Sequence, residues 1–479
     1  MTQTAPEPVS RVKVIVASVS AAVGAFLFGF DSSVINGAVD AIGSGFSLSP
    51  FVKGFTVAVA LLGCAVGAWY SGQLADRIGR KKVMFIGAVL FLASSIGSGF
   101  CSGVWDLMFW RIIGGFGIGV ASVISPAYIS EIAPAKMRGS LTSVHQLAIT
   151  IGIFAALLSD QVLQSHAGGA SETAFFGMSA WRWMFLVGAA PALVYAIVSV
   201  TLPESPRYLV RTGKGEEAAA ILHDMGEPNP QQKVADIKDS IQEEDRTSFA
   251  DIKGPRFGLR PLVWVGIILA SLQQMVGINA IFYYSSTLWK SVGFSEADAF
   301  KTSVITSIIN VVMTFVAILF VDRFGRRLLL LIGSTGMFVG LGMAALAFFN
   351  STMVDGEVSL PGSWGIIALI GANLFVVFFA ATWGPIVWVL LAEMFPNRQR
   401  SYALAIGTVS NWLSNFVVSV SFPFLSNRIG LGYLYGIFAA FAVISFAFVR
   451  TQIPETTGQE LESMTGGTLR ESNAATDKD

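Results

Sequence analysis

The sequence predicts an all-α integral membrane protein in which twelve transmembrane helices form two pseudo-symmetric halves of six helices each. Three observations support this prediction. Hydrophobic residues make up 53% of the 479 residues, and charged residues make up only 13%, about half of their share in soluble domains. Long apolar runs alternate with short charged segments along the whole chain. The charged segments also occur twice, at nearly one spacing.

Apolar runs of transmembrane length recur through the sequence. A run of about 20 apolar residues is needed to cross the hydrocarbon core of a bilayer. Twelve candidate runs have their centres near residues 23, 63, 92, 118, 150, 193, 271, 311, 336, 378, 413 and 440. The first run follows Arg11 and Lys13, is longer than a signal-peptide core and has no small-residue cleavage site. We therefore expect it to be retained as a membrane helix.

The charged motifs that follow the apolar runs form pairs. The pairs are Asp76-Arg77-Ile78-Gly79-Arg80 with Asp322-Arg323-Phe324-Gly325-Arg326, Glu131 to Arg138 with Glu393 to Arg400, and Pro203-Glu204 with Pro454-Glu455. Duplication of a unit of roughly 250 residues is the simplest cause. Transporters are commonly built from such repeats, and their ligand sites lie between the repeats.

The distribution of basic residues predicts the topology. Lys and Arg number roughly 25 on the side of both termini and roughly 5 on the other side, which places both termini in the cytoplasm. The only long polar interval separates the sixth run from the seventh, and it contains a turn at Gly213 followed by a short amphipathic helix. We expect a tail at 1–12, a six-helix bundle at 13–203, a helical linker at 204–260, a second bundle at 261–450 and a tail at 451–479, polar and disordered at its end.

Several tempting signals favour a structural interpretation. The segment Gly114-Gly115-Phe116-Gly117-Ile118-Gly119 resembles a nucleotide-binding loop, but it lies in an apolar run without a preceding strand and predicts helix packing. The scattered histidines and cysteines fit no metal spacing: His145, His166, His223, Cys64 and Cys101. We therefore expect no enzymatic activity, no cofactor, no metal and no nucleic-acid partner.

Taken together, the motifs resemble the sugar porter branch of the major facilitator superfamily, from about Lys13 to Glu462. The signatures are Asp76-Arg77-Ile78-Gly79-Arg80-Lys81, Pro203-Glu204-Ser205-Pro206-Arg207, Gln273-Gln274-Met275-Val276-Gly277-Ile278-Asn279 and Pro454-Glu455-Thr456. The resemblance implies two six-helix halves that rock around a central sugar site, the major facilitator fold. It implies a monosaccharide and a proton as partners within a lipid bilayer. We expect a monomer in a plasma membrane, and short outer loops favour a bacterial inner membrane.

Two opposite charges lie inside apolar runs rather than at their ends. A charge at the centre of a span costs on the order of 3 kcal/mol or more, so Asp31 and Arg111 are candidates for function and for pairing. A nearby cation and burial act in opposite directions on a carboxyl group, so a partner that approaches or retreats can make Asp31 bind and release a proton. By resemblance, sugar-proton symporters carry this aspartate in Phe28-Gly29-Phe30-Asp31 and pair it with Arg111. A static ion pair that only joins two helices remains the alternative.

Neutral amides and aromatic rings are suited to a sugar, because an amide both donates and accepts and a ring covers a C–H face. The amide candidates within apolar runs are Gln146, Gln273, Gln274, Asn279, Asn310 and Asn411, with Asn415 less clearly matched. The aromatic candidates are Phe28, Phe379, Trp388 and Trp412. By resemblance, Gln273, Gln274, Asn279 and Tyr283 contact sugar, and Gly277 lets their helix unwind. Hydrogen bonding between helices is the alternative role for these amides.

One position bears on the choice of sugar. Some xylose symporters of the family have a second glutamine two turns after the first one in the fifth span, where this chain has Ile153. Loss of a donor disfavours the substrate that depended on it, so hexoses are favoured. The sequence thus favours a proton-coupled hexose symporter that works by alternating access. A passive sugar uniporter, a pentose or inositol symporter with protons, and a transporter-like sugar sensor stay open.

The paired motifs also predict charge networks at the cytoplasmic ends of the spans. The candidate residues are Asp76, Arg80, Glu131 and Arg138 in the first half and Asp322, Arg326, Glu393 and Arg400 in the second. Asp76 is expected to cap a helix N-terminus, and Gly79 to allow a tight turn. By resemblance, these networks hold the cytoplasmic side closed in the outward-facing state. Simple anchoring of the helix ends is the alternative.

Overall fold

The computed structural model describes residues 8–133, 138–244, 249–255, 257–354, 357–395 and 397–453. The first helices are α1 Pro8–Gly45, α2 Pro50–Ile78, α3 Arg80–Gly99, α4 Val104–Ile132, α5 Arg138–Ala167, α6 Ala180–Val187, α7 Ala189–Thr201, α8 Pro206–Arg211, α9 Gly215–Asp224 and α10 Pro230–Glu244. The later ones are η1 Phe249–Ile252, α11 Pro261–Met275, α12 Ile278–Lys290, α13 Glu296–Phe324, α14 Arg326–Phe349, α15 Trp364–Phe378, η2 Phe379–Trp383, α16 Gly384–Glu393, α17 Asn397–Ile429 and α18 Leu431–Gln452.

Twelve helical segments among the described residues are long and apolar enough to cross a membrane, which confirms the predicted number. Each predicted centre lies within one of these segments. Three spans are assembled from shorter pieces, namely α6 with α7, α11 with α12, and α15 with η2 and α16. Backbone groups at such interruptions need new hydrogen-bond partners, so broken spans are places where side chains are recruited.

The chain divides into two compact units. Unit 1 comprises residues 1–32, 59–156 and 182–248, and unit 2 comprises residues 33–58, 157–181 and 249–479. Helices α1, α2 and α5 each contribute one part to unit 1 and the other part to unit 2. Unit 1 therefore contains only residues of the first half and the linker, whereas unit 2 combines parts of α1, α2 and α5 with the second half.

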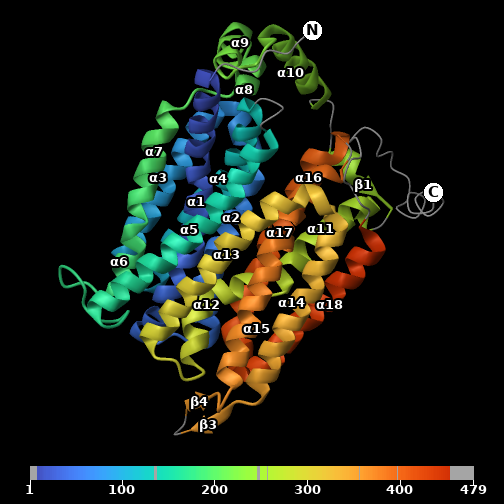
Figure 1. Cartoon of the computed structure of the whole chain (residues 1–479). Coiled ribbons are helices and arrows are strands. Elements are labelled where there is room, and N and C mark those ends of the chain that lie inside the picture. The colour runs from blue at the N-terminus through green and yellow to red at the C-terminus, as the bar shows by residue number, and fades with distance from the viewer. Residues whose placement is uncertain are drawn as a thin grey trace. The chain divides into compact units, whose positions relative to one another are not determined.

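Small residues set the packing in unit 1. A Cβ atom on Gly115 would lie 2.0 Å from the carbonyl oxygen of Ala60, and one on Gly119 would lie 2.2 Å from that of Cys64. The glycine-rich segment of α4 thus packs directly on the backbone of α2, which confirms the helix-packing interpretation. Figure 1 shows α8, α9 and α10 grouped beside one end of the unit 1 helices. The helix predicted after Gly213 is present as α9.

The duplicated motif has one backbone conformation in both copies. Gly79, between α2 and α3, has φ 93° and ψ 157°. Gly325, between α13 and α14, has φ 81° and ψ 151°. Only glycine adopts these angles readily, which confirms the tight turn expected at Gly79. The third duplicated motif, Pro454-Glu455, lies outside the described residues.

In unit 2, α14 packs against α15 and α18. Two short antiparallel ribbons accompany the helices: β1 (Lys253–Gly254) pairs with β2 (Gly258–Leu259), and β3 (Thr352–Val354) pairs with β4 (Glu357–Ser359). The all-α prediction did not include these ribbons. They lie outside the apolar runs, where helical periodicity is absent and β-branched residues such as Thr352 and Val354 favour extended backbone.

Candidate coupling and substrate site

A buried ion pair joins α1 to α4 within unit 1. Nη1 of Arg111 donates to Oδ1 of Asp31 at 3.0 Å and lies 3.4 Å from the carbonyl oxygen of the same residue. Asp31 is 6% exposed and Arg111 is 3% exposed. The guanidinium also lies 5.8 Å from the ring centre of Phe185. The pairing expected from their opposite charges is thus present, in surroundings that exclude most water.

Close packing of α1 on α5 places the neighbouring candidate residues. A Cβ atom on Gly29 would lie 1.9 Å from the carbonyl oxygen of Ile149, and one on Gly152 would lie 2.1 Å from that of Phe26. The segment that carries Phe28 therefore lies against the segment that carries Gln146 and Ile153. All three side chains are partly exposed. Among the described residues, no side chain or backbone group hydrogen bonds the amide of Gln146, so these residues leave its donors and acceptor unused.

The amides of α11, α12 and α17 form a hydrogen-bonded network in unit 2. Nε2 of Gln274 donates to Oδ1 of Asn411 at 3.2 Å, and Oε1 of Gln274 accepts from Nδ2 of Asn279 at 2.6 Å. Nδ2 of Asn411 in turn donates to Oε1 of Gln273 at 2.8 Å and to the carbonyl oxygen of Ala270 at 3.0 Å. The structure therefore brings four predicted site residues together.

The members of this network differ in remaining hydrogen-bond capacity. An amide side chain has two donor hydrogens and two acceptor lone pairs. Nε2 of Gln273 uses its donors on the carbonyl oxygens of Trp383 and Gly384, at 2.8 and 3.1 Å. Gln274 and Asn279 each have a donor hydrogen that makes no bond in this network. The network therefore leaves Gln274 and Asn279 able to bind a hydroxyl, while Gln273 has no donor left.

The bonds from Gln273 are made at a backbone interruption of another span. The α15 helix passes through the π-helical turn η2 before α16, where Pro385 lacks an N–H group. The carbonyl groups of Trp383 and Gly384 lie at this interruption and take the Gln273 amide as donor. On the other side, Gly277 has φ 86° and separates α11 from α12, as the sequence predicted.

The other predicted substrate residues are spread over unit 2. Tyr283 is buried on α12, and its hydroxyl accepts from Nδ2 of Asn415 on α17 at 3.2 Å. Asn310 on α13, Phe379 in η2 and Trp412 on α17 are buried, and Trp388 on α16 is partly exposed. The Phe379 ring centre lies 6.1 Å from that of Phe375. Within the described part of the chain, no side-chain hydrogen bond joins Asn310, Trp388 or Trp412 to the Gln274 network.

The charge network of unit 1 centres on Arg80. Nε and Nη2 of Arg80 donate to the two carboxylate oxygens of Glu131 at 3.1 and 2.9 Å, while Nη1 donates to Asp76 at 2.9 Å. Asp76 also pairs with Arg211 of α8 at 2.9 Å. The short linker helix is thus tied to the ends of α2, α3 and α4.

The expectation that Asp76 caps a helix N-terminus is wrong. Oε1 of Glu204 accepts from the backbone N–H groups of Arg80 at 3.0 Å and Lys81 at 3.3 Å, at the start of α3. Asp76 lies in the last turn of α2, where its two carboxylate oxygens form ion pairs with Arg80 and Arg211. A carboxylate stabilises the positive end of a helix from any part of the chain. The sequence could not show that the residue after Pro203 would reach this end.

The structure describes two side chains of the charge network predicted for the second half, Arg326 and Glu393. Nη2 of Arg326 donates to Oε1 of Glu393 at 3.2 Å, which joins the start of α14 to the end of α16. This pair repeats the contact between Arg80 and Glu131. The side chains of Arg138, Asp322 and Arg400 lie outside the described part of the structure.

Sequence reasoning missed several polar residues of α1 that belong to unit 2. The backbone N–H and the hydroxyl of Ser286 on α12 donate to Oδ1 of Asn36 at 2.9 and 3.0 Å. Asp40 accepts from Lys53, Lys290 and Thr287. Asn36 and Asp40 lie four residues apart on a helix, a spacing that places both on one face and could have indicated their shared role.

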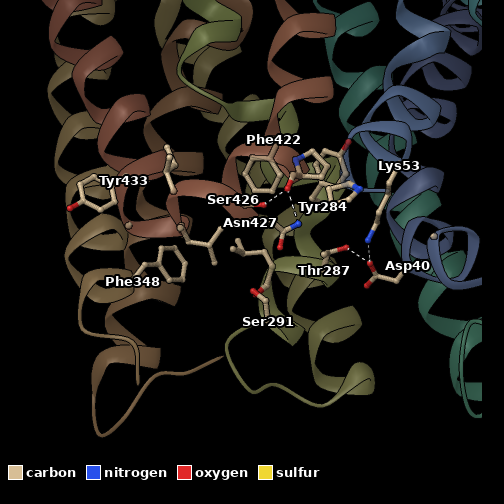
Figure 2. Close-up of a pocket in the computed structure, with 18 of the residues that line it drawn as sticks. Asp40, Lys53, Tyr284, Thr287, Ser291, Phe348, Phe422, Ser426, Asn427 and Tyr433 are labelled. Carbon is tan, nitrogen blue, oxygen red and sulfur yellow. Dashed lines mark hydrogen bonds and ion pairs between the residues drawn. The ribbon is translucent and has the colours of Figure 1, made fainter. Parts of the chain in front are cut away.

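Asp40 and Lys53 also line a cavity of about 670 Å³, together with Tyr284, Phe422 and Asn427 (Figure 2). Figure 2 shows Lys53 and Thr287 both directed at the Asp40 carboxylate. In the described residues, no group of three or more histidine, cysteine or acidic side chains is arranged to hold a metal ion. Residues of α1, α2, α12, α14, α17 and α18 line the cavity, and the amides of the Gln274 network are not among them.

The chain is similar to known transport proteins over almost its whole length. Residues 17–466 match the family described as Sugar (and other) transporter. The chain is 49% identical over 452 residues to the glucose transport protein of Synechocystis sp., covering 94% of this chain and 97% of that protein. It is 36% identical over 453 residues to the arabinose-proton symporter of Bacillus subtilis, covering 94% of each. A solved structure of the xylose transporter of Escherichia coli, partially occluded and inward open, matches with a TM-score of 0.81 and 32% identity, covering 94% of this chain and 100% of that one.

Proposed function

The chain belongs to the family of sugar (and other) transporters, and on this premise we propose that it carries a monosaccharide across a membrane together with a proton. It is a multi-pass membrane protein and not an enzyme. The observation that carries the coupling proposal is the buried pair between Asp31 and Arg111. Such a pair inside apolar spans has a high desolvation cost, so a role in the transport cycle is its best explanation.

Proton coupling would follow from the dependence of this pair on protonation. While Arg111 donates to Asp31, the carboxylate is held as an anion. If α4 withdraws the guanidinium, burial alone favours the neutral acid, and Asp31 takes a proton. A conformational change that alters their distance therefore loads and unloads the proton. If this change in distance also depends on sugar binding, the transport of the proton and the transport of the sugar are coupled.

Substrate binding is assigned to amides with open capacity. Gln146, Gln274 and Asn279 have donors or acceptors that the described protein groups do not use. A sugar hydroxyl both donates and accepts, so it suits these neutral groups. The remaining proposed contacts are Phe28, Ile153, Tyr283, Asn310, Phe379, Trp388, Asn411 and Trp412. Gln273, whose donors bond the carbonyl oxygens of Trp383 and Gly384, is proposed to support the site without contacting the sugar. The break at Gly277 gives α12 the freedom to move against α11 while Asn279 stays bonded to Gln274.

A hexose is the proposed substrate. Ile153 offers no hydrogen bond at the position where some xylose symporters have glutamine, and the relative with 49% identity is named for glucose. Relatives named for arabinose and xylose keep a pentose as the second candidate. A passive uniporter is the third candidate, since it would need the same amides but no titrating pair.

The cytoplasmic networks are proposed to act as gates. Arg80 with Glu131, and Arg326 with Glu393, hold the ends of neighbouring helices within each unit. Asp76, Arg138, Asp322 and Arg400 are assigned to the same networks by their place in the repeated motif. This proposal includes bundles at 13–203 and 261–450, cytoplasmic termini, a bacterial inner membrane and a monomeric carrier.

Transport by the purified protein in proteoliposomes tests this function. Uptake of labelled glucose, xylose, arabinose and inositol would be measured with an imposed proton gradient, and again after an ionophore has collapsed it. The proposal expects accumulation of a hexose above its external concentration only while the gradient is present. Equilibration at the same rate under both conditions would identify a uniporter. Accumulation of xylose alone would replace the hexose with a pentose and leave the coupling intact.

A further inference from the structure

Asp160 on α5 is a buried carboxyl group to which the proposed transport cycle gives no role. Its exposed fraction is 0%. Within the described residues, its one hydrogen bond comes from the backbone N–H of Gly37 on α1, 3.2 Å from Oδ2. The other oxygen, Oδ1, is buried and has no hydrogen-bond partner in the described part of the chain. An ionised carboxylate in this position would leave most of its acceptor capacity unsatisfied.

The side chain one turn further along α5 also has a buried acceptor oxygen without a hydrogen-bond partner among the described residues. Gln164 is 4% exposed, and its Oε1 is also buried without a partner among the described residues. Residues four apart on a helix lie next to one another on the same face. Oδ1 of Asp160 and Oε1 of Gln164 are both acceptors, so they cannot hydrogen bond to each other unless one of them carries a hydrogen atom. A proton on Oδ1 of Asp160 turns one acceptor into a donor that Gln164 can accept.

The charged groups on the surrounding elements are engaged elsewhere. On α1, Asp31 pairs with Arg111, and Asp40 pairs with Lys53 and Lys290. On α5, the ring of His166 stacks on Phe175 at 4.6 Å. At the start of α13, Glu296 accepts from the N–H of Ala170 at 3.0 Å, and Lys301 pairs with Asp298. None of these side chains pairs with Asp160, so no cation in the described structure offsets a negative charge there.

We propose that Asp160 is a second proton-binding site of this protein, in which the carboxyl group holds a proton and shares it with Gln164. The site forms where the second half of α1 packs against the second half of α5, since Gly37 supplies the other hydrogen bond. Ser33 Oγ and Asn36 Nδ2, on the same part of α1, are also buried without partners among the described residues. Water that enters when these helices separate would satisfy all of these groups at once and let the acid ionise.

The proton therefore stabilises the packed arrangement. The packed state binds it more tightly than a hydrated state does, so rising pH favours separation of the two helix segments. Asp31 differs in kind, because its charge is balanced by Arg111 at 3.0 Å. Asp160 would thus add a pH dependence to transport that remains when Asp31 can no longer titrate.

Infrared spectroscopy of the full-length protein in lipid tests the protonation directly. A protonated carboxyl group has a C=O stretch separate from that of a carboxylate, and the stretch shifts in heavy water. We expect this band near neutral pH in the wild type, in Asp31→Asn and in Glu172→Gln, which alters an exposed acid. Asp160→Asn should remove it, and the amide, nearly the same shape as the neutral acid, should preserve the fold. A band of equal intensity in the wild type and Asp160→Asn would overturn the proposal.

A second variant covers the case in which Asp160→Asn does not fold. Gln164→Leu removes the acceptor and leaves the acid, so the band should stay but move to higher frequency as its hydrogen bond is lost. A band at unchanged frequency would overturn the sharing with Gln164. Absence of any protonated-acid band in wild type would mean an ionised Asp160, paired with a rotated Gln164 amide or a cation, and would also reject the proposal.

The effect on uptake rests on the proposed function, whereas the infrared result does not. With Asp31 intact, Asp160→Asn should still accumulate sugar in a proton gradient. The uptake rate of this variant should begin to fall at a pH that is higher than in the wild type by about one unit or more, because the amide cannot lose a proton. A pH profile that coincides with that of the wild type, despite a lost infrared band, would reject the link between Asp160 and transport. Loss of gradient-driven uptake in the wild type itself would reject the proposed function and leave the site untouched.

Discussion

The buried ion pair of unit 1 and the buried amide network of unit 2 differ in charge. Unit 1 contains an ion pair, Asp31 with Arg111, and unit 2 contains a network of uncharged amides around Gln274. A charged pair changes strength with protonation, while an amide network does not titrate and can exchange one hydrogen-bond partner for another. The difference indicates a division of work in which the pair of Asp31 with Arg111 responds to protons and the amide network around Gln274 responds to hydroxyl groups.

The largest expected effect follows from removing the titrating group. Asp31→Asn should abolish accumulation of sugar in a proton gradient, because the amide cannot titrate and its link to Arg111 no longer depends on pH. Sugar binding and exchange of labelled for unlabelled sugar should survive, since the loaded carrier reorients without net proton movement. Accumulation and exchange would be measured side by side in proteoliposomes.

A static ion pair predicts a different pattern for the same variant. Loss of one partner would leave Arg111 buried and unpaired at a cost of about 3–5 kcal/mol, so binding, exchange and folding would decline together. Normal accumulation by Asp31→Asn would end the proposed coupling role. Either result would break the distinction between a proton-responsive ion pair and a sugar-responsive amide network.

The second effect concerns amides with open capacity. Gln274→Ala and Gln146→Ala should each weaken sugar binding by more than about tenfold, because a lost hydrogen bond to a buried hydroxyl costs about 1–3 kcal/mol. Equilibrium binding to the purified variants would be measured by calorimetry, with expression and thermal stability as controls. Unchanged affinity in both variants would remove these residues from the site.

Trp388→Ala should also lower transport, through lost ring contact or a looser α16.

The third effect separates a binding amide from a structural one. Gln273→Ala removes the donor to Trp383 and Gly384 and the acceptor of Asn411, and each unsatisfied buried group costs about 1–3 kcal/mol. Its main consequence should be a lower melting temperature, with sugar affinity preserved in the folded fraction. Gln274→Ala is the matched control, since it is expected to lose affinity first. An unchanged melting temperature with lost affinity would show that Gln273 contacts the sugar.

The smallest effect concerns selectivity. Ile153→Gln introduces an amide two turns from Gln146 and should favour pentose over hexose by roughly fivefold, the equivalent of about 1 kcal/mol for one hydrogen bond. Competition of xylose against labelled glucose would measure it. Ile153→Leu keeps the side chain apolar and should leave the ratio close to that of the wild type. A ratio that does not change in Ile153→Gln would remove this residue from the contacts that discriminate sugars.

The sequence by itself determined the number of spans, the duplication and the interruption at Gly277, because apolar length, repeated motifs and glycine are local properties of the chain. It also indicated that Asp31 and Arg111 pair, since two isolated charges in apolar spans have few other ways to be stabilised. Asp160 is a further acid in an apolar span, but it lies ten residues from the centre expected near 150 and was not among the predicted functional residues.

Only the tertiary structure decided which partner each polar group obtains. Glu204, rather than Asp76, caps α3, because the turn after α7 reaches the exposed N–H groups of Arg80 and Lys81. Gln273 donates to the carbonyl groups of Trp383 and Gly384, where a π-helical turn that no local pattern predicts meets α16, whereas the adjacent Gln274 has a donor hydrogen that its network does not use. Hydrogen bonds and ion pairs between helices depend on distances of a few ångströms between residues far apart in the chain, and composition and periodicity do not encode those distances.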